Sequence, residues 1–281
     1  MQFHRPETLE SALVLIAERP ARILAGGTDF FPALGGRTTR EPIVDLSRVN
    51  GLSGISRQGD VWRFGATTTW SKIAKAVELP AMFDGLRQAA RDVGSIQIQN
   101  AGTIAGNLCN ASPAADGVPP LLSLDAQVEV AGRSGRRVLP LARFITGVRK
   151  TELMRGEIVT AILVPDRPQA RSAFLKLGAR RYLVISIAMV AVALDLDVDG
   201  AIKDVNIAVG SCSAVATRLP DAERRLVGAR PELAVLKALL MDADLSQLTP
   251  IDDVRAPASY RRSAARELIC RAIVRCAKGE A

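Results

Sequence analysis

The sequence predicts an α+β protein of two domains, and three observations support that prediction. The chain has 281 residues, 48% of them hydrophobic, which is enough for two separate cores. In its second half, strand patterns come before helical patterns, as is typical of an α+β domain. The two parts are separated by Asp166-Arg167-Pro168-Gln169, a polar and turn-prone segment. We therefore expect one domain over residues 1–165 and another over residues 170–281.

The first domain is expected to consist of a small βα lobe over residues 1–50 and a larger α+β lobe over residues 51–165. Hydrophobic periodicity distinguishes helices from strands in both lobes. It predicts helices over residues 8–18, 70–77 and 81–92 and just after Pro119-Pro120, and strands over residues 22–25, 43–46, 62–66, 126–131 and 137–139, the last two as an antiparallel pair.

The second domain shows a sheet followed by helices. The turn at residues 197–200 is expected to join two of its strands as a hairpin. The predicted strands cover residues 173–177, 185–196 and 205–209, and the predicted helices cover residues 222–227, 233–241 and 259–277.

Composition excludes several classes of function. The net charge is +8, but the arginines are scattered and only 4% of residues are aromatic, so we expect no nucleic-acid partner. The longest apolar run, residues 182–194, is too short to span a membrane, and we expect a cytoplasmic protein. The four cysteines form no C-x-x-C pair, and His4 is the only histidine. We therefore expect no metal site and no histidine-based catalytic residue in this chain.

Two segments rich in small residues are the candidate binding sites. In the first, the apolar run from Ile23 ends in Gly26-Gly27 and Thr28. Consecutive backbone N–H groups in such a turn form a concave site that a diphosphate can occupy. Paired glycines also end ordinary strands, and Asp29 can instead cap the helix that follows.

The second segment, residues 99–116, is expected to be a loop, because it combines small residues, amides and hydroxyls and closes with a carboxylate. Gly102 and Gly106 allow close approach of the backbone to another group. Asp116 can accept a hydrogen bond from a ligand hydroxyl, or it can cap the helix near Pro119. Cys109 either reaches a ligand through its backbone or is a small buried residue.

Together these segments resemble the flavin-binding medium subunit of the molybdenum hydroxylases, the family of xanthine dehydrogenase, carbon monoxide dehydrogenase and quinoline oxidoreductase. The resemblance runs nearly end to end. It is carried by Phe3 and Pro6, residues 25–29 and 100–116, Glu157-Ile158-Val159, Phe174-Leu175-Lys176 and Tyr260-Arg261-Arg262. It implies a two-lobed FAD-binding domain of the PCMH or CO dehydrogenase flavoprotein type, followed by a C-terminal domain of antiparallel sheet plus helices.

The resemblance also assigns residues to FAD. Lys176 matches a lysine beside the flavin ring, although a surface lysine on a strand is the plain alternative. Ile158 and Val159 match a pair that packs on the ring, although any buried strand shows such a pair. The residues so assigned are Ile23, Leu24, Ala25, Gly26, Gly27, Thr28, Asp29, Phe30, Thr103, Gly106, Asn107, Cys109, Asn110, Ser112, Asp116, Ile158, Val159 and Lys176.

Two positions depart from the family pattern. Ala105 stands where the family has a glycine, which is tolerable if the backbone there has a negative φ. Gln99 stands where we expected arginine. Either change can alter how the segment approaches the cofactor.

The implied function is electron transfer. FAD in this chain would take electrons from 2Fe-2S clusters of a small partner subunit and pass them to an external acceptor, while a large partner subunit carries the molybdopterin. A dimer of such heterotrimers is expected. Tyr260, Arg261, Arg262 and Arg266 face either a partner or solvent. The alternatives are a self-sufficient flavin oxidoreductase of the same superfamily, or an assembly subunit that no longer binds flavin.

Overall fold

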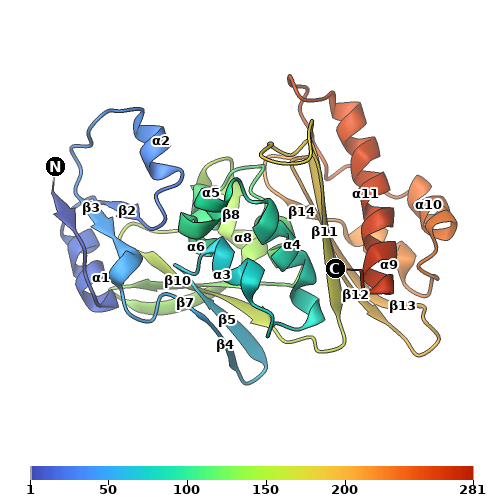
Figure 1. Cartoon of the computed structure of the whole chain (residues 1–281), viewed down its shortest axis with the longest axis horizontal. Coiled ribbons are helices and arrows are strands. Elements are labelled where there is room, and N and C mark those ends of the chain that lie inside the picture. Colours follow the sequence, from blue (N-terminus) through green and yellow to red (C-terminus); the bar gives the residue numbers. More distant parts are fainter. Residues whose placement is uncertain (1, 281) are drawn as a thin grey trace. The chain divides into compact units, whose positions relative to one another are not determined.

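The computed structural model describes residues 2–280, and the chain divides into two compact units (Figure 1). Unit 1 comprises Met1–Lys72, Ile96–Ala111 and Ala126–Asp166. Unit 2 comprises Ile73–Ser95, Ser112–Asp125 and Arg167–Ala281. Segments from the first half of the sequence therefore belong to both units, and each unit is described by itself.

Unit 1 begins with the predicted βα lobe. Its parallel sheet has the order β1-β3-β2. The hydroxyl of Thr8 accepts a hydrogen bond from the N–H of Ser11, which caps helix α1. Apolar side chains of α1 pack on β3 and form the core of this lobe. The bounds are β1 Phe3–His4, α1 Leu9–Glu18, β2 Arg22–Leu24, α2 Phe30–Leu34, β3 Ile43–Asp45 and the 3₁₀ helix η1 Leu46–Arg48.

The rest of unit 1 is built on a five-stranded antiparallel sheet of order β4-β5-β10-β6-β7. The predicted pairing of β6 with β7 is confirmed. Strand β10 lies at the centre of the sheet and pairs with β5 and β6. The bounds are β4 Ile55–Gln58, β5 Val61–Gly65, α5 Ile96–Ala101, α6 Ile104–Asn110, β6 Gln127–Gly132, β7 Gly135–Pro140, α8 Leu141–Phe144, β8 Ile145–Gly147, β9 Lys150–Thr151 and β10 Ile158–Pro165; α3, Trp70–Lys75, starts in this unit.

Unit 2 has an antiparallel sheet of order β11-β12-β13-β14, and the expected hairpin joins β12 to β13. Helices follow the sheet, so the predicted α+β arrangement is confirmed. The bounds are η2 Ala81–Phe83, α4 Asp84–Asp92, α7 Val118–Ser123, β11 Arg171–Leu177, β12 Ala188–Leu196, β13 Ile202–Gly210, β14 Thr217–Arg218, α9 Pro220–Leu226, α10 Leu233–Met241 and α11 Ala258–Lys278.

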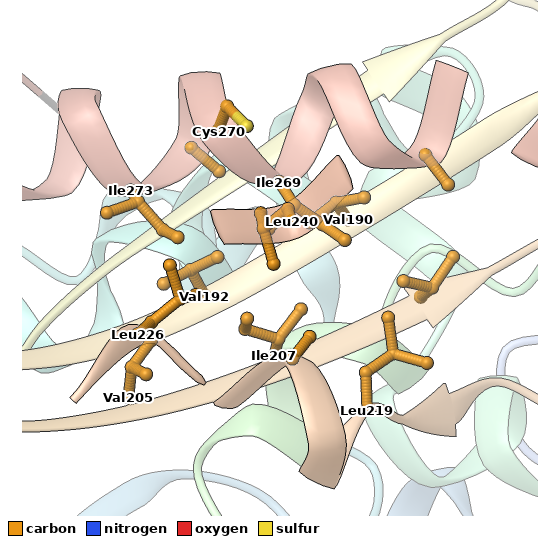
Figure 2. Packing of buried hydrophobic residues seen from close by; sticks show 14 of the residues in the cluster. Val190, Val192, Val205, Ile207, Leu219, Leu226, Leu240, Ile269, Cys270 and Ile273 are labelled. Carbon is orange, nitrogen blue, oxygen red and sulfur yellow. The ribbon is translucent and has the colours of Figure 1, made fainter. Parts of the chain in front are cut away.

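Helices cover both faces of the unit 2 sheet, which explains why β12 is apolar along most of its length. On one face, Val190 and Val192 pack in the main core with α9, α10 and α11. Figure 2 shows Ile269 and Ile273 directed from α11 toward the strands. On the other face, Met189 packs with Ala89 of α4. The core therefore fixes β11, which carries Lys176, and β12, which begins two residues after Ser186.

Two absences within residues 2–280 bear on function. No helix in that range is both long and apolar enough to cross a membrane. In the same range, no group of three or more histidine, cysteine or acidic side chains is placed to hold a metal ion.

Candidate cofactor site

The first glycine turn lies in unit 1, between β2 and α2. Gly27 has a φ of +74°, a conformation that favours glycine. Within the described chain, the backbone N–H groups of Gly26, Gly27 and Thr28 donate no hydrogen bond to another protein group. Three adjacent N–H groups without a protein acceptor are available to donate to an anion.

The first turn packs directly against the second segment. A Cβ atom built on Gly26 would lie 2.0 Å from the carbonyl oxygen of Ala101, so the two backbones touch there. A Cβ atom on Gly102 would lie 3.5 Å from the hydroxyl oxygen of Thr28. The structure therefore brings the two candidate segments together, and only glycine fits at position 26.

The second segment is mostly helical, which corrects our description of it as a loop. Helices α5 and α6 flank a short turn at Gly102 and Thr103. The hydroxyl of Thr103 caps α6 by accepting a hydrogen bond from the N–H of Gly106 at 3.1 Å. The next N–H groups are also used, because Ile104 donates to the carbonyl of Thr68 and Ala105 to that of Ala66. The first three N–H groups of α6 therefore already have acceptors within the protein.

Ala105 stands where the family has a glycine, and the backbone there can carry a side chain. It lies within α6, is buried, and does not have a positive φ. Its methyl group therefore causes no strain in the helical backbone.

Asn107 is the one residue of α6 with an unsatisfied buried side-chain atom among those described. Its side-chain oxygen is buried and has no hydrogen-bond partner. Such an atom normally costs free energy, so its presence points to a missing donor. A hydroxyl group can supply that donor, whereas an ionised phosphate cannot.

The other assigned residues of unit 1 have different surroundings. Asn110 is bonded through its side-chain oxygen and its carbonyl to Arg149, a contact that the sequence did not suggest. Cys109 is exposed, so the prediction of a small buried residue is wrong. Ile158 and Val159 lie in β10, are 3% and 4% exposed, and Ile158 packs in the core with α1.

Unit 2 holds a buried polar cluster centred on Asp116. The ammonium of Lys176, on β11, donates to Asp116 Oδ2 at 2.8 Å, and the hydroxyl of Ser186 donates to Oδ1 at 3.1 Å. The side chains of Lys176 and Asp116 are 10% and 11% exposed. The alternative of a surface lysine is therefore wrong, and Ser186 is a partner that the sequence did not reveal.

Electrostatics mark Asp116 as an unusual carboxyl group. Burial raises its pKa, and the ammonium and hydrogen bond of Lys176 partly offset that rise. Burial also raises the pKa of Asp92, whose carbonyl oxygen lies 3.4 Å from the Lys176 ammonium. Asp116 does not cap α7, because that helix begins after Gly117 without a side-chain cap. An ionised carboxylate has room for about four acceptor contacts, so Asp116 can accept more than the two it has.

Four further residues have well-defined surroundings. Asp29 precedes α2 but makes no side-chain capping bond, so that alternative is wrong. Ser112 accepts a hydrogen bond from the N–H of Ala114 and so shapes its own turn. Tyr260 is 51% exposed, as expected for an outer position. Arg261, in contrast, is only 3% exposed, so the prediction that it faces a partner or solvent is wrong.

Comparisons with known proteins show which families the chain resembles. Residues 1–167 match the family described as the FAD binding domain in molybdopterin dehydrogenase. Residues 173–276 match the CO dehydrogenase flavoprotein C-terminal domain. The chain is 32% identical over 280 residues to the nicotine 6-hydroxylase medium subunit of Paenarthrobacter nicotinovorans, covering 98% of this chain and 96% of that one. It is 31% identical to the carbon monoxide dehydrogenase medium chain of Afipia carboxidovorans, covering 97% and 95%.

Solved structures show the same likeness. A Cu,Mo-CO dehydrogenase chain superposes with a TM-score of 0.91 and 28% identity, covering 99% of this chain and 98% of that one. A chain of quinoline 2-oxidoreductase from Pseudomonas putida 86 superposes with a TM-score of 0.90 and 25% identity, covering 99% and 97%.

Proposed function

The chain belongs to the family whose FAD-binding domain occurs in molybdopterin dehydrogenases, and from this premise we propose that it is the FAD-binding electron-transfer subunit of a multi-subunit molybdenum hydroxylase. Relatives named as medium subunits or medium chains align over nearly the whole of both sequences, which supports the same role here. Bound FAD would supply the redox centre, and the protein would supply its position and its electrostatic surroundings.

One observation carries the binding proposal: three adjacent backbone N–H groups in the first turn have no protein acceptor. Gly26, Gly27 and Thr28 present these donors, and the turn is fixed against the second segment through the contact of Gly26 with Ala101. Backbone N–H groups bind a diphosphate without any cationic side chain. We assign the diphosphate to this turn, together with the flanking residues of the segment Ile23 to Phe30.

Polar side chains would bind the hydroxyl groups of the cofactor. The unpartnered oxygen of Asn107 and the carboxylate of Asp116 are acceptors, and a ribityl or ribose hydroxyl is a donor. The Nζ atom of Lys176 lies 2.8 Å from Asp116 Oδ2, and this contact favours the ionised, accepting form of that carboxyl. The remaining assigned residues, Thr103, Gly106, Cys109, Asn110, Ser112, Ile158 and Val159, are proposed to line the same cofactor.

The redox partners are proposed to reside in other subunits. We propose a small iron–sulfur subunit and a large molybdopterin subunit, in a cytoplasmic dimer of heterotrimers. Relatives named as a medium subunit and a medium chain support such partners. We also propose that residues 1–165 and 170–281 are its two domains, a division supported by the two matching family models.

Flavin and metal analysis of the chain, alone and in its complex, tests the proposal. The full chain purified alone should release one FAD per chain on denaturation and contain neither iron nor molybdenum. The complex purified from its source should contain both metals. A flavin-free chain in both preparations would favour an assembly subunit. Turnover of a substrate by the isolated flavoprotein would favour a self-sufficient oxidoreductase.

A further inference from the structure

A buried arginine lies at the start of the last helix of unit 2. Arg261, in α11, is 3% exposed, although arginine is rarely buried unless it is paired. Its Nη2 lies 2.6 Å from Asp253 Oδ1, which supplies the counter-charge. Asp253 is held in turn by the N–H groups of Arg255 and Ala256. This pairing accounts for the charge of Arg261 and leaves the role of its other nitrogens open.

The Nη1 atom of Arg261 holds two carbonyl groups that are distant in sequence. It donates to the carbonyl of Ile187 at 2.6 Å and to that of Ser211 at 3.1 Å. Ser211 has a φ of +61°, a left-handed conformation that costs free energy in a residue other than glycine. The hydrogen bond from Arg261 helps to hold this backbone in place.

Both carbonyl groups belong to backbone that contacts the segment ending in Asp116. On one side, the N–H of Ser211 donates to the carbonyl of Pro113 at 3.0 Å. On the other side, Ser186, the residue before Ile187, donates from its hydroxyl to Asp116. The N–H of Ile187 also donates to the carbonyl of Leu177, next to Lys176. Two branches that start at Arg261 therefore converge on residues 113–116.

We infer that Arg261 is a positioning residue that fixes the Asp116 carboxylate for hydrogen bonding to the cofactor, an inference that rests on the proposed function. It acts through Ser211, which bonds Pro113, and through Ile187 and the neighbouring Ser186, which bonds Asp116. The two carbonyls that Arg261 bonds belong to backbone whose own hydrogen bonds reach Pro113 and, through Ser186, Asp116. The planar guanidinium provides several donors in fixed directions, which suits this role.

Titration of Asp116 in the cofactor-free full chain tests the inference separately from FAD binding. The chain is labelled with carbon-13 at aspartate carboxyls, and Asp116→Asn identifies the signal. In Arg261→Met, the Ser186 hydroxyl should no longer be held against Asp116, so the pKa of Asp116 should rise. Arg261→Lys should return it toward the wild-type value. Arg271→Met, a change at an exposed arginine on the same helix, should leave it unchanged.

A double-variant cycle with Ser186→Ala tests the branch through Ile187. Ser186→Ala should itself raise the pKa of Asp116, and adding Arg261→Met should raise it by less than Arg261→Met does alone. The dissociation constant for FAD should rise about tenfold in Arg261→Met, as expected for the loss of one hydrogen bond.

An unchanged Asp116 titration in a folded Arg261→Met chain would overturn the inference. If that variant does not fold, an unchanged Asp116 pKa in a folded Arg261→Gln chain, whose side chain has only two N–H donors for the three acceptors of Arg261, would overturn it equally. If the wild type binds no FAD, the proposed function fails, and the titration still reports whether Arg261 positions Asp116.

Discussion

Replacing Lys176 with methionine would leave the buried carboxylate of Asp116 without its cation. The two side chains are 10% and 11% exposed, so little solvent is available to compensate. Removing one partner of a buried ion pair typically costs about 3–5 kcal/mol. The loss of stability has a similar upper limit, because Asp116 can instead take up a proton in the folded variant. Neutralising a carboxyl group of ordinary pKa 3.8 at pH 7 costs about 4 kcal/mol. We expect unit 2 of Lys176→Met to lose about 3–4 kcal/mol of stability at pH 7.

The pH dependence of that loss has a definite sign. In the variant, burial raises the pKa of Asp116 in the folded chain, and no ammonium opposes the rise. Folding therefore takes up a proton. Stability is greatest below the ordinary pKa of 3.8 and falls as the pH rises through the raised folded-state value. The deficit relative to the wild type should thus shrink by up to about 1.4 kcal/mol for each pH unit between 7 and 5.

The assay must report on unit 2, because both tryptophans, Trp62 and Trp70, lie in unit 1. Hydrogen exchange of the β11 and β12 amides, measured across the pH range, follows the relevant strands. Adding Asp116→Asn to Lys176→Met should restore much of the loss, because no buried charge then remains. Lys203→Met, at an exposed lysine on β13, should change little. Wild-type exchange in Lys176→Met at every pH would refute the reasoning.

Three further predictions concern unit 1. Gly26→Ala should push the two segments apart, costing about 1–3 kcal/mol and weakening FAD binding, as followed by tryptophan fluorescence and FAD titration. Gly147→Ala, whose Cβ would meet only ordinary contacts, is its control. Asn107→Leu should stabilise the cofactor-free chain by about 1 kcal/mol in urea unfolding and should lower the affinity for FAD. A variant that gains both stability and FAD affinity, or loses both, would contradict our assignment. Asp29→Ala should leave the unfolding midpoint unchanged, since that side chain makes no capping bond; a clear loss would show otherwise.

Much of the fold follows from local patterns. The helix over residues 8–18 and the hairpin around residues 197–200 were predicted because periodicity and turn residues agree there. Helix α11 was predicted nearly to its ends for the same reason. The order of the strands within each sheet could not be predicted from local sequence patterns. Strand β10, for example, pairs with β5 almost a hundred residues earlier, as Ala161 opposite Gly65 shows.

The second glycine-rich segment shows why local propensity fails. Its glycines, asparagines and threonine disfavour helix, so a loop was expected. The structure forms α6 there because distant backbone receives the first N–H groups, such as that of Ile104 at the carbonyl of Thr68. Tertiary contacts thus outweighed propensity.

The candidate site was predictable in part. Glycine pairs and polar residues pointed to the two segments, and the structure brings these into contact through Gly26. The surroundings of Asp116 were not predictable, because Ser186 lies 70 residues away in sequence. Burial of Arg261 was missed because its carbonyl partners, Ile187 and Ser211, lie 74 and 50 residues away.

The central claim is that the backbone of the first turn binds a diphosphate. Competition binding to the full chain tests this claim most directly. With FAD bound to the wild type, ADP should displace it and riboflavin, which lacks phosphate, should not. Gly26→Ala should weaken ADP and FAD together. Riboflavin binding as tightly as FAD, or ADP failing to compete at any concentration, would contradict the account.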